Sequence, residues 1–75
     1  MEAKARNRYV YTLKFTYTDI VTNKPDIETN SIVDKITKKG GKVINYNHIV
    51  MGGSVAIPMH LLTFIHYEAD GPIIL

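Results

Sequence analysis

The chain has 75 residues, a formal net charge of +2 and no cysteine, which limits it to one small domain without disulfides or thiolate metal sites. A single core of this size contributes only about 3–5 kcal/mol, so such chains usually depend on a metal or a partner subunit. No apolar run reaches the roughly 18 residues of a membrane span and no signal-peptide core is evident, so we expect a cytoplasmic protein.

The first eight residues, MEAKARNR, are polar and mostly basic, and we expect them to form a flexible segment ahead of the domain. The stretch RYVYTLKFTYT (residues 8–18) then alternates between large apolar and polar side chains. This period of two predicts a strand buried on one face, which carries Tyr9, Tyr11, Leu13, Phe15 and Tyr17. Aromatic side chains on a sheet can also form a surface that stacks on nucleic-acid bases. The core face of a sheet produces the same pattern and is the more common origin of it.

Residues 19–28 are expected to form a connection, because the sequence NKPD within them favours a turn. Pro25 disfavours the helical conformation for the residue before it, Lys24. A helix is expected to follow, and either Asp26 or Thr29 is placed to accept hydrogen bonds from the free amides of its first turn.

The predicted helix extends to about Lys39 and carries a narrow apolar stripe at spacings of three and four residues, formed by Ile32, Val33 and Ile36. The sequence KKGG predicts its end, since a glycine at position 40 is free to take the left-handed conformation that commonly follows a last helical turn. Lysines near this end also interact favourably with the negative end of the helix dipole.

Two apolar runs flank a pair of glycines in the stretch NHIVMGGSVAIPMH (residues 47–60). A two-residue turn at Gly52 and Gly53 would pair Met51 with Ser54, because such turns need the positive φ that glycine allows. In this register one face collects Ile44, Tyr46, His48, Val50, Val55, Ile57, Met59, Leu61, Ile65 and Tyr67. A shift of one residue would destroy that sorting, so the pattern favours a hairpin over a phosphate-binding loop, which normally precedes a helix.

The third strand is expected in the middle of the sheet, because HLLTFIHY (residues 60–67) is apolar on both faces over its second half. Pro58 lacks a ladder donor and should therefore lie beyond the reach of the first strand. The sequence predicts an α+β domain over residues 9–69 in the order βαββ. Its one helix packs on a three-stranded, mainly antiparallel sheet of order 1-3-2, a β-hairpin arm protrudes, and residues 70–75 form an apolar C-terminal tail.

This βαββ order is similar to that of dodecins, small proteins with one helix against a three-stranded sheet that assemble into hollow flavin-binding shells. The resemblance concerns the order of elements over most of the chain. Dodecins stack the flavin on a tryptophan, and this sequence contains none. The resemblance therefore implies a fold, and it assigns no cofactor and no functional residue.

Candidate sites for metal binding and catalysis are weak. His60 and His66 share a face but are separated by about 20 Å along a strand. His48 points to the opposite face, where we expect a neighbouring residue to form a hydrogen bond with its side chain. Ser54 has no evident base beside it, and nothing pairs Glu68 with an acid–base partner. We therefore expect no enzymatic activity, no metal and no cofactor.

One helix with three apolar positions cannot cover both sides of LLTFI (residues 61–65), so self-association is expected. The leading hypothesis is a non-enzymatic homo-oligomer, a dimer or higher, that binds a protein partner or a small ligand at its subunit interface. The predicted interface comprises Tyr46, His48, Val50, Gly52, Gly53, Val55, Ile57 and Met59. The alternative is an accessory domain for nucleic acids that binds through Lys4, Arg6, Arg8, Lys38, Lys39 and Lys42.

Overall fold

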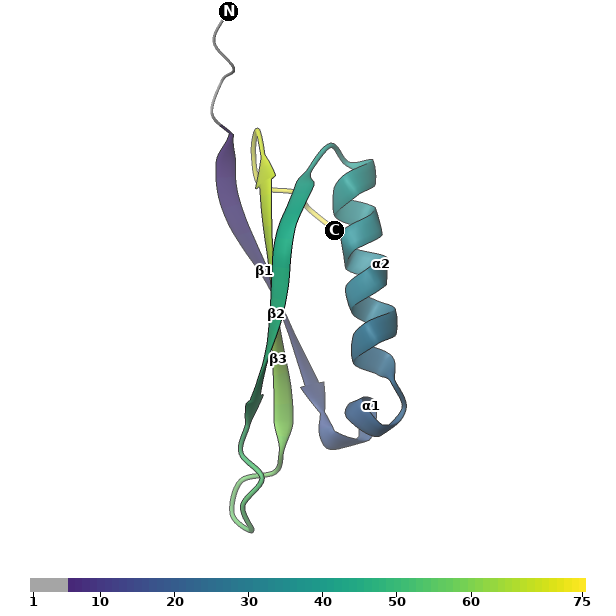
Figure 1. Cartoon of the computed structure of the whole chain (residues 1–75), viewed down its shortest axis with the longest axis vertical. Coiled ribbons are helices and arrows are strands. Elements are labelled where there is room, and N and C mark those ends of the chain that lie inside the picture. Colours follow the sequence, from purple (N-terminus) through teal and green to yellow (C-terminus); the bar gives the residue numbers. More distant parts are fainter. Residues whose placement is uncertain (1–5) are drawn as a thin grey trace, which may run out of the picture.

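The structure, a computed structural model, describes residues 6–75. Its elements follow the order β1 (Asn7–Thr16), α1 (Tyr17–Val21), α2 (Lys24–Lys38), β2 (Lys42–Met51) and β3 (His60–Ala69). The three strands form one sheet, α2 lies along one face of it, and the loop between β2 and β3 projects beyond the sheet at one end (Figure 1). The protein is thus a two-layer α+β domain, as the sequence predicts.

The strand order is β1-β3-β2, and both pairs are antiparallel. This confirms that the last strand is central. β1 pairs with β3 without interruption from Asn7 opposite Ala69 to Thr16 opposite His60. The strand begins at Asn7, so Arg8, which the sequence analysis assigned to the preceding segment, is part of the sheet. Residues 1–5 of that segment, including Lys4, lie outside the described residues.

The predicted two-residue turn is wrong. Met51 pairs with His60 and Val50 with Leu61, so residues 52–59 all belong to the connecting loop. The amides of Gly53 and Ser54 both donate to the carbonyl of Ile57, at 2.9 and 3.1 Å, so the loop closes on itself and adds no rungs to the ladder. Pro58, which lacks an N–H, lies outside the strands as predicted.

The corrected register leaves most side chains on their predicted faces. Met51 pairs with residue 60 where residue 54 was expected, and a shift by this even number of residues preserves the alternation. Tyr46, His48 and Val50 therefore still share a face with Ile65 across the ladder. Ile44 leaves this face because a bulge between Val43 and Asn45 takes it out of the alternation. Val55, Ile57 and Met59, which were predicted on the same face, belong to the loop and to no strand.

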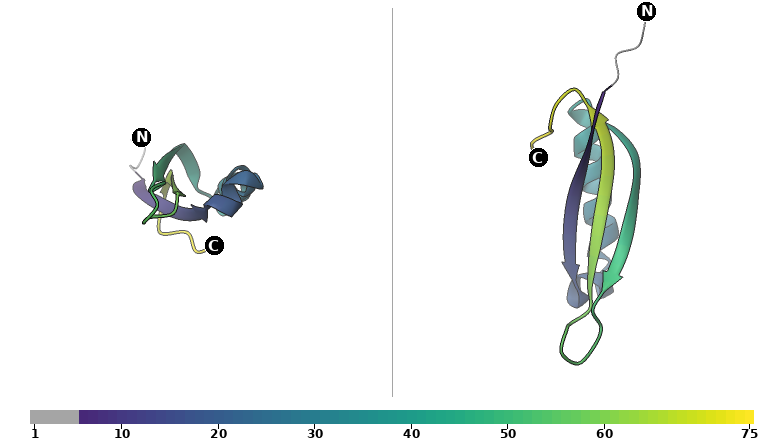
Figure 2. Two further views of the ribbon diagram at one scale, coloured as in Figure 1. Left: turned by 90° about the horizontal axis from the view of Figure 1, so that it is seen from below. Right: turned by 90° about the vertical axis from the view of Figure 1, so that its left-hand side faces the viewer.

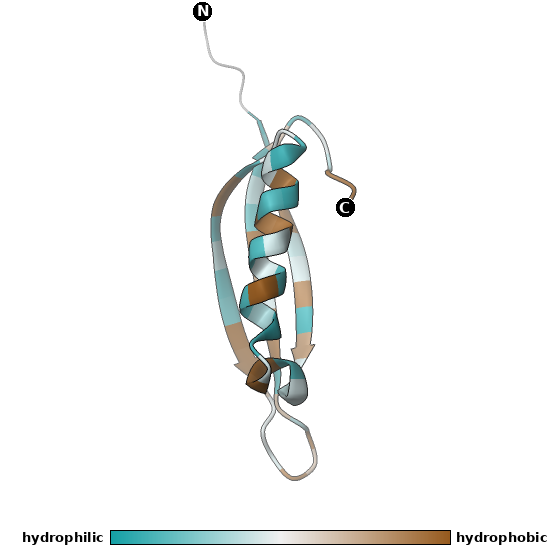
Figure 3. Ribbon diagram, turned by 90° about the vertical axis from the view of Figure 1, so that its right-hand side faces the viewer, coloured by the Kyte–Doolittle hydropathy of each residue, from teal (hydrophilic) through white to brown (hydrophobic). Residues whose placement is uncertain are grey.

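The hydrophobic core lies between α2 and one face of the sheet (Figure 3). Ile32 and Ile36 of α2 pack against Ile65 and Tyr67 of the central strand. Tyr67 also stacks on Tyr9, with 5.5 Å between the ring centroids. The predicted helical stripe and the predicted core face of β1 thus meet, and six buried apolar residues result: Phe15, Ile32, Ile36, Ile65, Tyr67 and Ala69.

The end of α2 matches the prediction. Gly40 has a φ of +91°, and its amide donates to the carbonyl of Thr37 at 3.1 Å. The amide of Gly41 donates to the carbonyl of Ile36 at 2.9 Å. These two bonds form a Schellman motif, which satisfies carbonyls of the last turn and directs the chain into β2.

The beginning of α2 differs from the prediction. The helix starts at Lys24, and Pro25 occupies its first turn, where the missing N–H has no cost. Asn23 precedes it in the left-handed conformation, with a φ of 62° and no capping hydrogen bond from its side chain. Asp26 and Thr29, the predicted caps, both lie inside the helix.

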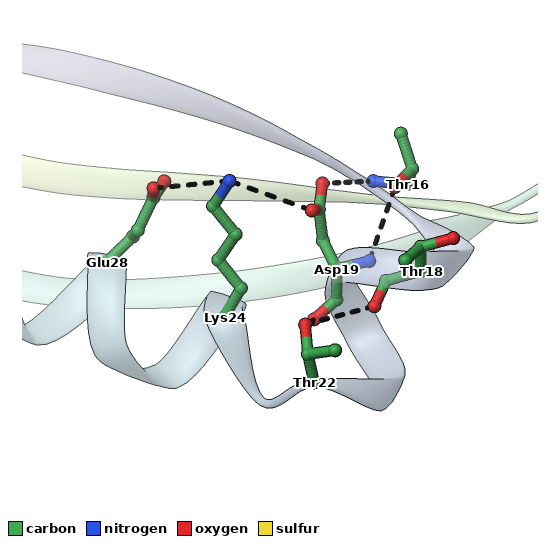
Figure 4. Close-up of polar contacts among 6 residues, drawn as sticks. All are labelled: Thr16, Thr18, Asp19, Thr22, Lys24 and Glu28. Carbon is green, nitrogen blue, oxygen red and sulfur yellow. Dashed lines mark hydrogen bonds and ion pairs between the residues drawn. The ribbon is translucent and has the colours of Figure 1, made fainter.

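A second helix, α1, replaces the end of the predicted first strand and part of the predicted connection, so Tyr17 lies in a helix and is exposed where a buried strand position was predicted. Thr16, the last residue of β1, caps it through reciprocal bonds that form a capping box (Figure 4). The Thr16 amide donates to the Asp19 carboxylate at 2.9 Å, and the Asp19 amide donates to the Thr16 hydroxyl at 3.3 Å. Lys24 then links the two helices, with its ammonium 3.7 Å from Asp19 and 3.9 Å from Glu28.

The capping box predicts a pH dependence. The hydrogen bond from the Thr16 amide lowers the pKa of Asp19 below its ordinary value of 3.8, and the nearby Lys24 adds to this effect. A carboxylate with a lowered pKa in the folded state stabilises the fold above its unfolded pKa, and this contribution is lost as the pH falls through the folded pKa. We expect Asp19→Asn to lower the melting temperature at pH 7, and the difference from wild type to shrink below pH 3.8.

Asp34→Asn is the matched control, since Asp34 forms an exposed ion pair with Lys38 on the surface of α2. Its effect on thermal stability should be smaller and nearly independent of pH, because exposed ion pairs contribute little. Circular dichroism melts of the three proteins between pH 2 and pH 7 make the comparison. An Asp19→Asn effect that stays constant across this range would contradict the proposed role of the carboxylate.

Candidate functional site

The face of the sheet opposite α2, here called the open face, is not covered by any element of residues 6–75 (Figure 2). The register arranges its side chains in five rows across β1, β3 and β2. From the loop end these rows are Thr16, His60 and Met51; Lys14, Leu62 and Ile49; Thr12, Phe64 and Asn47; Val10, His66 and Asn45; and Arg8, Glu68 and Lys42.

The rows nearest the loop contain a cluster of apolar side chains, here called the apolar patch, formed by Ile49, Met51, Leu62 and Phe64. Leu62 of the central strand lies opposite Ile49 of β2, and both point away from α2. Ile49 and Met51 are about half exposed, at 46% and 45%. Side chains of this type are normally buried, so the patch is a candidate contact surface.

The β2–β3 loop borders the same end of the open face. Ile57, Pro58 and Met59 line a pocket of about 500 Å³ together with residues at the end of β1 and the start of β3. The other lining residues are Lys14, Thr16, Tyr17, Thr18 and His60. Since Lys14, Thr16 and His60 belong to the open face, the loop and the apolar patch form a continuous surface.

The loop also contains three predicted interface residues that project into solvent or shape the turn. Val55 is fully exposed. Gly52 and Gly53 have φ values of +78° and +98°, a conformation that favours glycine. A β-carbon on Gly52 would come within 2.4 Å of the Pro58 carbonyl oxygen, so this position also requires close approach of two backbone segments.

Three other predicted interface residues, Tyr46, His48 and Val50, lie on the α2 side of β2. They remain exposed because β2 is an edge strand that the helix covers only in part. Tyr46 contacts His48 edge to face, with 5.7 Å between the ring centroids. The structure therefore separates these residues from the apolar patch, which lies on the other face.

His48 provides a hydrogen-bond partner for the buried hydroxyl group of Thr63. Its Nδ1 atom lies 2.7 Å from the hydroxyl oxygen of Thr63, whose residue is completely buried at the centre of β3. A buried hydroxyl needs such a partner to avoid a desolvation cost. This contact agrees with the expectation that a neighbour satisfies His48, and it gives that histidine a structural role.

Three of the basic residues of the nucleic-acid alternative are engaged with groups of the same chain. The Arg6 guanidinium donates to the Gly40 carbonyl at 2.6 Å and lies 3.5 Å from the Asp70 carboxylate. Lys38 lies 3.0 Å from the Asp34 carboxylate, and the Lys39 ammonium donates to the carbonyl of Ile74. The remaining two described members of the set, Arg8 and Lys42, lie on the outer strands of the open face, on either side of Glu68.

Other classes of site find little support in the part of the chain that the structure describes. Among residues 6–75, no group of three or more histidine, aspartate or glutamate side chains is arranged to hold a metal ion. The longest helix described, α2, has 15 residues, and no helix in this part of the chain is long and apolar enough to cross a membrane.

Comparison with known proteins gives no further guidance. No protein-family model, no curated protein and no solved structure matches this chain. The function must therefore be argued from the surface of the molecule itself.

Two buried threonines predict mutational effects of opposite sign. The hydroxyl of Thr29 is buried in α2 and has no hydrogen-bond partner among the described residues, whereas the hydroxyl of Thr63 contacts His48. Valine has nearly the same shape as threonine without the hydroxyl. We expect Thr29→Val to stabilise the fold by about 1 kcal/mol and Thr63→Val to destabilise it by about 1 kcal/mol.

Urea unfolding at one pH measures both effects as shifts of the midpoint, provided that the slope of each transition stays unchanged. Each variant serves as the control for the other, because both replace one buried threonine by valine. Destabilisation by Thr29→Val would show that its hydroxyl has a partner, such as a buried water, in solution.

Proposed function

We propose that this chain is a non-enzymatic binding protein that works as a homo-oligomer and docks a second copy on the apolar patch and the adjoining loop. The observation that carries the proposal is the uncovered apolar patch on the open face. Its four residues, Ile49, Met51, Leu62 and Phe64, occur in a chain with only six buried apolar residues among those described. A second copy would supply the layer that a single helix cannot.

The area needed for a stable contact indicates that the patch and the loop belong to one interface. Stable protein contacts bury about 800 Å² on each partner, and four partly exposed side chains provide only a fraction of that. Full burial of an aliphatic side chain contributes about 1.5–3 kcal/mol, whereas the loss of translational and rotational freedom costs about 4–15 kcal/mol. Exposed apolar side chains of the loop, Val55, Ile57 and Met59, supply the additional area.

The surroundings of the patch fit the usual anatomy of an interface, with an apolar centre and a polar rim. Thr12, Lys14 and Thr16 of β1 border the patch on one side. These residues give the rim hydrogen-bonding groups and one charge without placing a charge at its centre. Because a second copy carries the same surface, a two-fold symmetric contact satisfies both subunits at once.

The nucleic-acid alternative rests on fewer observations. Arg6, Lys38 and Lys39 are each engaged with groups of the same chain, and Glu68 lies between Arg8 and Lys42 on the open face. A phosphate-binding surface usually gathers basic side chains on one side of the domain. Salt distinguishes the two proposals, since binding to phosphates weakens steeply as salt is raised and apolar docking does not.

We expect Ile49→Asp and Ile57→Asp to convert an oligomer into a monomer, because each places a charge at the centre of the proposed contact. Val50→Asp is the matched control, since it neighbours Ile49 on β2, is also exposed, and points to the α2 side. Light scattering coupled to size exclusion at micromolar concentration measures the mass, and circular dichroism checks that the helix is retained.

Several results would refute the proposal. A wild-type mass of 8.5 kDa at these concentrations would exclude stable self-association. An Ile49→Asp variant that keeps the wild-type mass would move the interface away from the patch. If Ile49→Asp loses its helix signal, the milder Ile49→Asn variant repeats the test.

A further inference from the structure

The end of the open face that lies away from the loop contains a groove of about 340 Å³. Polar residues from all three strands line it: Arg8 and Tyr9 from β1, His66 from β3, and Asn45, Tyr46 and Asn47 from β2. Val10 and Ile44 supply apolar walls. This groove borders the apolar patch, since Asn47 lies opposite Phe64, but no residue of the patch lines it.

The register places four of these residues in three neighbouring rows of the open face. His66 lies on the central strand, directly opposite Val10 on one side and Asn45 on the other. Neighbouring strands are about 4.8 Å apart, so this row spans about 10 Å, the dimension of a small molecule. Arg8 and Asn47 lie in the rows on either side of it.

A β-bulge next to the groove supports a binding site at this end of the sheet. The bulge lies between Val43 and Asn45, next to the groove, and takes Ile44 out of the regular alternation. Ile44 thereby becomes part of the lining of the groove. Bulges are common next to binding sites, because they redirect one side chain without disrupting the rest of the sheet.

The polar groups of the groove have no partners within residues 6–75. No hydrogen bond or ion pair there involves the side chains of Arg8, Asn45, Asn47 or His66, whereas Arg6 binds both Gly40 and Asp70. A guanidinium, two amides and an imidazole thus line the groove without contributing a side-chain hydrogen bond to the described part of the fold. Groups of this kind are typical of the few polar residues that orient a ligand in a site.

The charge around the groove favours an anion. Arg8 lines it, and the row that contains Arg8 also holds Glu68 and Lys42, so this row carries two positive charges and one negative charge. We propose that the groove binds a small oxyanion, a carboxylate or a phosphate group attached to a short apolar body. The Arg8 guanidinium forks onto the anion, the Asn45 and His66 side chains donate to it, and Val10 and Ile44 contact the apolar part.

All groups of the groove come from one protomer, so this proposal goes beyond self-association and does not depend on it. Titration of the full chain with inorganic phosphate, acetate and benzoate, followed by amide chemical shifts, tests it. We expect shifts centred on Asn45, Asn47 and His66, and tighter binding of benzoate than of acetate. Benzoate that binds no better than acetate would overturn the role of the apolar walls.

The decisive comparison is between Arg8→Gln and Lys14→Gln. Both remove one positive charge from β1 on the same face, but Lys14 lies three rows away from Arg8, beside the apolar patch. We expect Arg8→Gln to weaken phosphate binding about tenfold, as for loss of a charge-assisted bidentate contact, and Lys14→Gln to change it less than about twofold. Glu68→Gln should strengthen binding, because it removes a negative charge next to Arg8.

Equal weakening by Arg8→Gln and Lys14→Gln would overturn the proposal, because it would show only attraction to the general surface charge. The absence of saturable shifts with any of the three anions would also overturn it. Arg8→Gln should keep the wild-type oligomeric mass, and Ile49→Asp should keep phosphate binding. These two results separate a failure of the groove from a failure of the docking surface.

Discussion

A single 15-residue helix can cover only one face of a three-stranded sheet, and most other features of this protein depend on that limit. The helix covers the face that contains Ile65 and Tyr67, where the core forms. The opposite face keeps Leu62 and Phe64 of the same central strand outside any core that the described residues form. A central strand with apolar residues on both faces usually lies between two layers, and here the described residues provide only one.

The alternation of strand residues explains why the fold could be predicted although the turn could not. A period of two assigns side chains to faces, but it is equally satisfied by every even shift of the register. Two glycines favoured the shortest turn, whereas the structure places Met51 opposite His60 and lets Gly53 and Ser54 bond to Ile57 within the loop. Sequence patterns therefore gave the strand order and the core face, and the pairing depended on contacts inside the loop.

Local signals were available for one feature that the sequence analysis missed. The capping box of Thr16 and Asp19 follows the spacing of three residues that marks a helix start, so α1 could have been found. The groove is different, because Arg8 and His66 are distant in sequence and meet only through the pairing of β1 with β3. The predicted interface residues Tyr46 and His48 lie on the face they share with Ile65, as the alternation predicts, and there His48 contacts Thr63.

The open face is divided into an apolar end and a polar end. Leu62 and His66 are four residues apart on β3, which corresponds to about 13 Å along a strand. All residues that line the groove belong to one protomer, so a subunit docked on the apolar patch would stand beside the groove without completing it. The two proposed sites would then act independently, because loss of assembly leaves every residue that lines the groove in place. One sheet with a single covered face could in this way hold two separate sites, with no change in the fold of either subunit.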